Sequence, residues 1–412
     1  MDIVEKVWDA VVVGGGPSGS LFATELAKRG ADISVFEEHA QVGLPSHCTG
    51  HLSIRSLRNL GLYPLPEGIL ENTFSAANFY SPTGTKLSVH LSKPVTCAIN
   101  RAKFDAYLAE KAQKAGADYN MGTMVQSLVV KDNFVTGVKI VQRLGSLTRV
   151  PANLVVDAEG ISSRLLRQAG LQALNPAGLV YSVETKVDGV KDLEEHAVEV
   201  YVGKHYAPGF YGWVVPLSDD SAKVGLATQN GNPKEFLERL VRNHPVASKQ
   251  LRNAKFNNAV FHSLTLGGPI PRAYGNGFLA VGDCASQVKP TTGGGVIFSL
   301  ICAKIAAEVA SDALKKNDYS SGVLAMYQER FMKQLGFDFN AMLKARRLIN
   351  SFSDQKIDRV MRFAQKVEFA KALQDVDEID FQGRTLLGII RKPAAYATFA
   401  YLLWLYLSEF HL

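Results

Sequence analysis

The chain opens with apolar and amphipathic segments in the order strand, helix, strand. An apolar run from Val7 to Val13 is followed by a glycine-rich turn, a helical stretch from Pro17 to Arg29 and a second apolar run from Ile33 to Phe36. Short apolar runs that alternate with helical patterns are typical of parallel βαβ units. The first sixty residues therefore predict the start of a parallel α/β domain.

Short apolar runs broken by turn signals fill most of the middle of the chain, which predicts antiparallel strands. The expected strand regions are 74–99, 124–156 and 180–266. Helices are expected at 101–115 and 233–242. A strand at 278–281 followed by a helix at 294–310 returns to the α/β pattern, and after Asp318 the pattern is helical to the end.

Composition places the chain among globular proteins. It has 412 residues, 47% of them hydrophobic and 20% charged, which excludes disordered, collagen-like and coiled-coil classes and indicates more than one domain. The net charge of +6 is dispersed, so nucleic acid is not an expected partner. The four cysteines form no CxxC pair and no metal-ligand spacing, and the N-terminus leaves no room for a signal peptide. We expect a cytoplasmic protein without a metal site.

A dinucleotide-binding turn follows the first strand. The stretch from Gly14 to Gly19 reads GGGPSG and opens a helix, and Glu37 ends the second strand. In such a turn the first glycine permits the tight bend, the second lets backbone approach a pyrophosphate, and the third lets helix pack on strand. The carboxylate accepts hydrogen bonds from a ribose hydroxyl and disfavours a 2′-phosphate, which predicts NAD or FAD and not NADP.

Three further segments resemble one large family of FAD-dependent enzymes, which includes aromatic hydroxylases, flavin halogenases and geranylgeranyl reductases. They are 157–164 (DAEGISSR), Gly282-Asp283 with Pro290 and 293–295 (GGG), and Asn100-Arg101 with Phe104-Asp105. Their order and spacing match over roughly the first 310 residues. The resemblance implies FAD as the cofactor.

Within that family the chain resembles the geranylgeranyl reductases of isoprenoid lipid and chlorophyll synthesis. The resemblance rests on Cys48 in the loop 45–50 (PSHCTG) and on the segment 211–216 (YGWVVP). Val215 stands where that subfamily has phenylalanine, and His51 follows Gly50 where a more glycine-rich loop is usual. These departures concern the substrate and not the class.

Residue chemistry and the resemblance together give the candidate site. The candidate FAD-binding residues are Gly14, Gly16, Ser18, Gly19, Glu37, Cys48, Thr49, Arg101, Val125, Asp157, Gly282, Asp283, Gly294, Gly295 and Val296. Asp157 has an alternative role, as the cap of a helix expected at 162–169. The candidate catalytic residues are Cys48, Tyr211 and Trp213.

The catalytic candidates have simpler alternatives. A lone cysteine is most often a small buried hydrophobe. Tyr211 and Trp213 are two apart on a strand and face the same way, as ordinary sheet packing requires, but they also suit an aromatic wall along an apolar chain. The resemblance favours the functional role for all three.

The expected fold class is α/β: a Rossmann-type FAD-binding domain interleaved with a mostly antiparallel β substrate domain, plus a C-terminal helical region. The expected bounds are 1–75, 97–172 and 265–312 for the FAD-binding domain, 76–96 and 173–264 for the substrate domain, and 313–412 for the helical region.

The C-terminal run from Ala394 to Leu407 is uncharged and aromatic-rich. Its fourteen residues make a helix of roughly 21 Å, short of a bilayer's ~30 Å hydrocarbon core, so it is not expected to span a membrane. It is either a core-packing helix or an interfacial element, and Arg391-Lys392 at its start suit the second. Peripheral contact with the inner face of the membrane is therefore an expectation.

The leading functional hypothesis is an FAD-dependent reductase of carbon–carbon double bonds in a geranylgeranyl chain, carried on an isoprenoid lipid or another prenylated molecule. No second dinucleotide turn is present, so electrons are expected from transiently bound NAD(P)H, ferredoxin or a deazaflavin. The alternatives are an FAD-dependent monooxygenase or halogenase on the same fold, and a prenyl-binding protein without catalysis.

Overall fold

A computed structural model describes residues 6–141 and 146–407, and the chain divides into two compact units. Unit 1 comprises Met1–Ser46, Arg101–Gly178 and Thr265–Phe339, and unit 2 comprises His47–Asn100, Leu179–Leu264 and Asn340–Leu412. The division differs from the expected domain bounds in three respects. Residues 47–75 and 97–100 belong to unit 2, residues 173–178 belong to unit 1, and the C-terminal helical region is shared between the units.

A parallel sheet forms the centre of unit 1, in the strand order β19-β11-β1-β2-β8. Its strands are β1 (Trp8–Val13), β2 (Ile33–Glu37), β8 (Asp118–Met121), β11 (Leu147–Asp157) and β19 (Phe278–Ala280). The short strand β18 (Tyr274–Gly275) adds an antiparallel edge beside β19. The α/β pattern predicted for the first sixty residues is confirmed.

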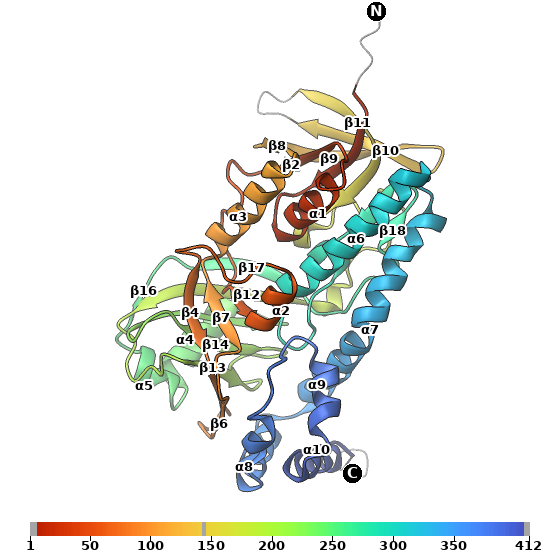
Figure 1. The fold of residues 1–412 in the computed structure, drawn as a ribbon. Helices are drawn as coiled ribbons and strands as arrows, with labels where there is room; N and C mark the ends of the chain where they lie inside the picture. Colours follow the sequence, from red (N-terminus) through yellow and green to blue (C-terminus); the bar gives the residue numbers. More distant parts are fainter. Residues whose placement is uncertain (1–5, 142–145, 408–412) are drawn as a thin grey trace, which may run out of the picture. The chain divides into compact units, whose positions relative to one another are not determined.

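Three helices belong to this unit's α/β part, and α1 packs against both of the others (Figure 1). They are α1 (Pro17–Ala27), α3 (Arg101–Lys114) and α6 (Val296–Lys316). The predicted meander is also present, because β9 (Met124–Lys131), β10 (Phe134–Val141) and the first half of β11 pair antiparallel. The second half of β11 then joins the parallel sheet beside β1.

An eight-stranded sheet forms the centre of unit 2, in the order β16-β12-β15-β14-β13-β5-β6 with β17 beside β12. The neighbouring strands along this order pair antiparallel, except that β13 and β5 are parallel. The strands are β5 (Ala76–Tyr80), β6 (Lys86–His90), β12 (Leu179–Asp188), β13 (Ala197–Val202), β14 (Tyr211–Pro216), β15 (Ser221–Thr228), β16 (Lys255–Phe256) and β17 (Val260–Thr265).

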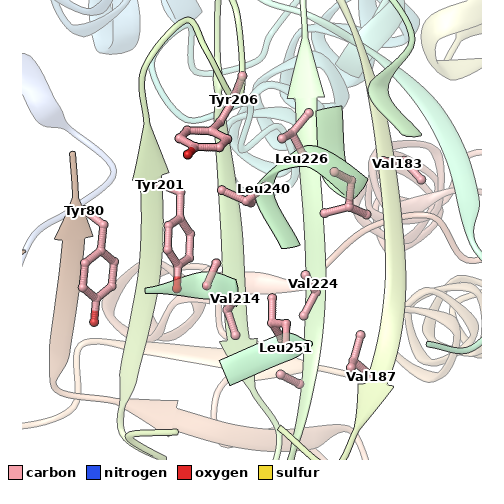
Figure 2. Packing of buried hydrophobic residues seen from close by; sticks show 14 of the residues in the cluster. Tyr80, Val183, Val187, Tyr201, Tyr206, Val214, Val224, Leu226, Leu240 and Leu251 are labelled. Carbon is pink, nitrogen blue, oxygen red and sulfur yellow. The ribbon is translucent and has the colours of Figure 1, made fainter. Parts of the chain in front are cut away.

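One face of this sheet carries a hydrophobic core. Side chains from neighbouring strands, among them Val183, Val224 and Leu226, pack with Leu240 of α4 (Pro233–Asn243) and Leu251 of α5 (Ala247–Leu251) (Figure 2). A separate three-stranded sheet, β3-β7-β4, also belongs to unit 2. It consists of β3 (His51–Ser53), β4 (Leu70–Phe74) and β7 (Thr96–Ile99), and the short helix α2 (Ile54–Asn59) follows β3.

This small sheet explains why residues 47–75 group with unit 2. Leu52 of β3 and Thr73 of β4 both pair with Cys97 of β7, so the segment is held by antiparallel hydrogen bonds within the unit. Apolar periodicity indicates that a segment is a strand, but it does not name the strand's partner.

The C-terminal region is helical, as predicted. It comprises α7 (Ser321–Ser351), α8 (Asp354–Lys366), η4 (Phe369–Leu373), α9 (Gln382–Ile389) and α10 (Pro393–Leu407), the η elements here and below being 3₁₀ helices. Tyr401 of α10 stacks on Phe363 of α8, with ring centroids 4.3 Å apart. No helix within the described residues is long and apolar enough to cross a membrane.

Candidate active site

The glycine turn of unit 1 has the close backbone approaches that a dinucleotide turn requires. Gly14 has a φ of +98°, and a Cβ there would lie 2.4 Å from the carbonyl oxygen of Ala158. A Cβ on Gly19 would lie 2.0 Å from the Gly14 carbonyl oxygen. A Cβ on Gly16 would meet nothing within 4 Å, so the turn is open on that side. Gly16 is also the N-cap of α1 and supplies no side-chain cap, which leaves the helix N-terminus suited to an anion.

The Glu37 carboxylate is buried at the end of β2, beside this turn. Its Oε2 accepts a hydrogen bond from the Gly15 N–H at 2.8 Å, and its Oε1 accepts one from the His39 N–H at 3.0 Å. These bonds hold the carboxylate against the glycine turn, where an acid can accept from a ribose hydroxyl.

Asp157, at the end of β11, is fully buried, and its two carboxyl oxygens differ in their hydrogen bonding. Its Oδ1 accepts from the Glu159 N–H at 3.1 Å, whereas its Oδ2 has no hydrogen-bond partner among the described residues. Burial and the nearby Glu159 charge raise the pKa of Asp157 well above its ordinary value. A buried orphan acceptor next to the glycine turn fits a ligand that donates hydrogen bonds.

The helix expected at 162–169 is wrong. The structure has only η1 (Gly160–Ser162) there, followed by turns, because the Glu159 side chain accepts from the Leu165 N–H at 2.8 Å and stabilises a compact loop. Asp157 therefore does not cap an α-helix, although its bond to the Glu159 N–H is a local one.

Asp283 lies in η3 (Gly282–Ala285), directly after β19. Burial raises its pKa, and the positive charge of Arg101 opposes that rise. Arg101 is itself held by Asp105 through two parallel hydrogen bonds, Nε to Oδ1 at 3.1 Å and Nη2 to Oδ2 at 3.0 Å. The Asp283 carboxyl group and the Arg101 guanidinium, which come from separate segments of unit 1, therefore interact electrostatically.

Glycines line the surroundings of Asp283. A Cβ on Gly295 would lie 2.8 Å from Asp283 Oδ1, and a Cβ on Gly282, whose φ is +87°, would lie 2.8 Å from Ser18 Oγ. Gly294 and Gly295 precede Val296, the first residue of α6, and Gly295 caps the helix without a side-chain acceptor. Val125 is a buried residue of β9.

These features fit a bound dinucleotide such as FAD. Unit 1 brings the predicted glycines, Ser18, Glu37, Arg101, Asp157 and Asp283 onto the carboxyl ends of parallel strands and the N-termini of α1, α3 and α6, where open α/β sheets bind ligands. No group of three or more metal-ligating side chains occurs in residues 6–141 and 146–407.

The remaining predicted residues belong to unit 2. Cys48 is partly exposed, whereas Cys97, Cys284 and Cys302 are buried. Tyr211 and Trp213 lie on β14 and meet edge to face, with ring centroids 5.9 Å apart. Burial raises the pKa of the Tyr211 phenol.

Sequence reasoning missed three charged residues in this part of unit 2. Glu184 of β12 accepts hydrogen bonds from Trp213 Nε1 at 3.0 Å and from Thr49 Oγ1. Lys223 of β15 donates to the Thr49 carbonyl oxygen at 2.9 Å and pairs with Glu71 at 2.5 Å. The available signal was an acid in the middle of a predicted strand, between Val183 and Thr185.

Comparison with known proteins places the chain among flavoproteins. Residues 8–300 match the family model described as FAD binding domain. A digeranylgeranylglycerophospholipid reductase 2 of Methanopyrus kandleri is 31% identical, over 94% of this chain and 97% of the relative. A digeranylgeranylglycerophospholipid reductase of Methanocaldococcus jannaschii is 33% identical, over 95% of this chain and 97% of the relative.

Solved structures agree on the fold. A geranylgeranyl bacteriochlorophyll reductase-like protein of Thermoplasma acidophilum superposes with a TM-score of 0.85 and 25% identity, over 96% of this chain and all of that one. The flavin-dependent brominase Bmp2 reaches a TM-score of 0.71 at 18% identity, over 93% of this chain and 98% of that one. At that identity the brominase shows a shared fold alone.

Proposed function

The chain belongs to the geranylgeranyl reductase family of FAD-dependent oxidoreductases, enzymes that reduce carbon–carbon double bonds of isoprenoid chains, and from this we propose that its substrate is a digeranylgeranylglycerophospholipid. The observation that carries the proposal is the extent of the match. Relatives named for this lipid align over more than nine tenths of both chains, so the likeness includes unit 2 as well as the FAD-binding part.

The residues of unit 1 would hold the cofactor. Glu37 would accept from a ribose hydroxyl, Asp283 would accept from a ribityl hydroxyl, and the N-terminus of α6 at Val296 would stabilise negative charge. When bound and reduced, FAD supplies the hydride for the alkene.

The second hydrogen arrives as a proton, and we propose that Cys48 donates it. Isolated trisubstituted alkenes accept hydride poorly unless positive charge develops at the more substituted carbon, so a proton must be delivered to the other carbon. The Cys48 thiol loses its proton to that carbon and regains one from solvent, and each reduced double bond gains one hydride and one proton. A thiol is compact and compatible with an apolar chain, whereas an unpaired carboxylate is costly to bury.

Tyr211 and Trp213 would form an aromatic wall along the isoprenoid chain. Their rings meet at one face of the sheet of unit 2, and Trp213 is only partly buried by its protein neighbours. Such a wall would exclude water, which would otherwise capture the developing positive charge.

Helix α10 supports contact with a membrane surface, where a lipid substrate resides. Its solvent-facing stripe is apolar throughout and follows helical spacing: Pro393, Tyr396, Ala400, Leu403, Trp404 and Leu407. Trp404 is 61% exposed and Tyr396 66% exposed. The opposite side packs on the protein through Ala395 and Phe399. The packed side of α10 thus suits core packing, and its exposed side suits a membrane interface, the two roles expected from the sequence.

The electron donor is proposed by chemical class. NAD(P)H, ferredoxin and a deazaflavin each reduce flavins, and the chain has one dinucleotide turn, which the FAD requires. Transient docking of one of these carriers would supply the electrons.

The test is anaerobic incubation of dithionite-reduced holoprotein with digeranylgeranylglycerophospholipid, followed by mass spectrometry. The expected product gains two hydrogen atoms for each double bond reduced. Unchanged lipid, with FAD shown to be reduced, would overturn the substrate proposal, and in air a product that has gained one oxygen atom would favour a monooxygenase. Replacing dithionite by each of the three carriers in turn identifies the donor.

A further inference from the structure

Three residues of unit 2 lie in one row across its large sheet. Gly225 of β15 pairs with Glu184 of β12 on one side and with Trp213 of β14 on the other. Directly paired residues of adjacent strands project from the same face of a sheet. The next residues along these strands, Val183 and Leu226 among them, belong to the hydrophobic core on the opposite face.

The glycine in the middle of the row makes room for the indole. A Cβ on Gly225 would lie 2.4 Å from Trp213 Cζ2 and 2.8 Å from Trp213 Nε1, so no other residue fits without moving the ring. The indole therefore lies across β15, and its Nε1 donates to Glu184 Oε2 at 3.0 Å. A glycine in a strand interior often marks such a close approach.

The same carboxylate oxygen also holds the loop that carries Cys48. Thr49 Oγ1 donates to Glu184 Oε2, and the Thr49 carbonyl oxygen accepts from Lys223 Nζ at 2.9 Å. Lys223 Nζ is fixed in turn by the Ile99 carbonyl oxygen at 3.0 Å and by Glu71. The residue next to Cys48 is thus fastened at its side chain and at its backbone.

Burial of the Glu184 carboxyl group carries a desolvation penalty. The side chain is buried, and burial raises its pKa, while the bonds from Thr49 and Trp213 and the charge of Lys223 lower it and the charge of Glu71 raises it. An apolar residue at this strand position would avoid the desolvation of a carboxyl group. Packing alone therefore does not account for an acid here.

We propose that Glu184 is a positioning residue of the reductase: one carboxylate oxygen holds the Trp213 indole and the Cys48 loop in a fixed relation, so that the wall beside the isoprenoid chain and the thiol keep their mutual geometry. The inference rests on the roles proposed above for Cys48 and Trp213. It adds an acid that acts through both of them.

Two readouts test the positioning without turnover. Cys48 is the one cysteine of the four that is not buried, so its rate of alkylation by iodoacetamide in the folded holoprotein reports on the loop. Trp213 fluorescence, measured after Trp8→Phe and Trp404→Phe remove the other two tryptophans, reports on the indole. The variants are Glu184→Ala, Glu184→Gln and Gly225→Ala. The matched control is Glu199→Gln, because Glu199 is also buried, on β13, and accepts from Tyr201 and Gln250 in the core instead.

We expect Glu184→Ala to speed Cys48 alkylation at least ~5-fold, the lower end of what losing a buried hydrogen bond produces. The same variant should shift Trp213 emission. Gly225→Ala should shift the emission while leaving alkylation close to wild type, because Thr49 keeps its partner. Glu184→Gln should restore both signals, since an amide oxygen accepts the same two bonds. In single-turnover alkene reduction, Glu184→Ala should lower the rate at least ~10-fold with FAD occupancy unchanged.

Wild-type alkylation and emission in Glu184→Ala would overturn the inference. So would equal effects in Glu199→Gln, which would indicate general loosening of the sheet. Should Glu184→Ala not fold, Thr49→Val decides, because it removes the bond from the loop to the Glu184 carboxylate and leaves the acid in place. Faster Cys48 alkylation is then expected, and a wild-type rate would overturn the inference. If wild-type protein reduces no isoprenoid lipid while the alkylation and emission results are as expected, the proposed substrate is wrong and the positioning by Glu184 stands.

Discussion

Cys48 differs from the other cysteines in exposure, which makes its proposed role testable by one substitution. Cys48→Ala and Cys48→Ser should keep FAD occupancy and the rate of flavin reduction near wild type. Single-turnover alkene reduction should slow at least ~100-fold, the lower end of what a positioned proton donor contributes. Stopped-flow absorbance and product mass spectrometry measure the two steps separately.

A substitution in the same loop, Ser46→Ala, is the control for the Cys48 variants, and it should leave alkene reduction unchanged. An alanine variant of Cys48 that reduces the lipid at the wild-type rate would show that a histidine or a bound water delivers the proton. Loss of FAD in that variant would instead make Cys48 a cofactor residue.

At the scale of elements, α10 presents an uncharged surface to solvent on one side and packs on the protein with the other. Leu403→Glu combined with Trp404→Glu should weaken binding to anionic phospholipid vesicles at least ~10-fold, because each side chain transfers apolar surface out of water. The flavin absorption spectrum should not change. Vesicle flotation measures the partition.

Phe261→Glu on β17 is the matched control for α10, because Phe261 is an equally exposed aromatic residue, at 58%, outside that helix. It should leave vesicle binding intact. Undiminished partition of the α10 double variant would contradict the assignment of this helix to the membrane surface.

At the scale of the whole molecule, FAD binding should stabilise the fold, since the residues proposed to hold it come from three separate segments of unit 1. A ligand at one hundred times its Kd adds about 2.7 kcal/mol to the free energy of unfolding. Glu37→Ala should weaken FAD binding by roughly 1.5 to 3 kcal/mol, the range for a hydrogen bond to a charged group. Removing FAD should therefore lower Tm by several degrees in wild type and by less in the variant.

Differential scanning calorimetry of holoprotein and stripped protein measures this effect. Glu38→Ala is the control, because Glu38 is an exposed neighbour whose side chain pairs with Arg164 at 3.9 Å. A purified protein that is colourless and cannot be reconstituted with FAD would refute the assignment of the cofactor residues.

Residue patterns along the chain were enough to predict the features whose parts are contiguous. The glycine turn, the helix that it opens and Glu37 belong to one strand–turn–helix–strand unit. Within that unit Gly14 is required by its φ of +98°, and Gly19 by its approach to the Gly14 carbonyl oxygen. The same holds for the meander, whose turns lie between neighbouring strands. Local chemistry suffices in such cases, because a short connection leaves few alternative partners.

The features that depend on strand pairing became visible only in the folded chain. Residues 47–75 join unit 2 because β3 and β4 pair with β7, which no periodicity reveals. The row of Glu184, Gly225 and Trp213 exists because β15 pairs with both β12 and β14, and a register slip of one residue would turn these side chains to the other face. In the sequence Glu184 is a charged residue inside a predicted strand, and nothing there indicates its partners. They become visible only when the sheet brings residues 49, 184 and 213 together.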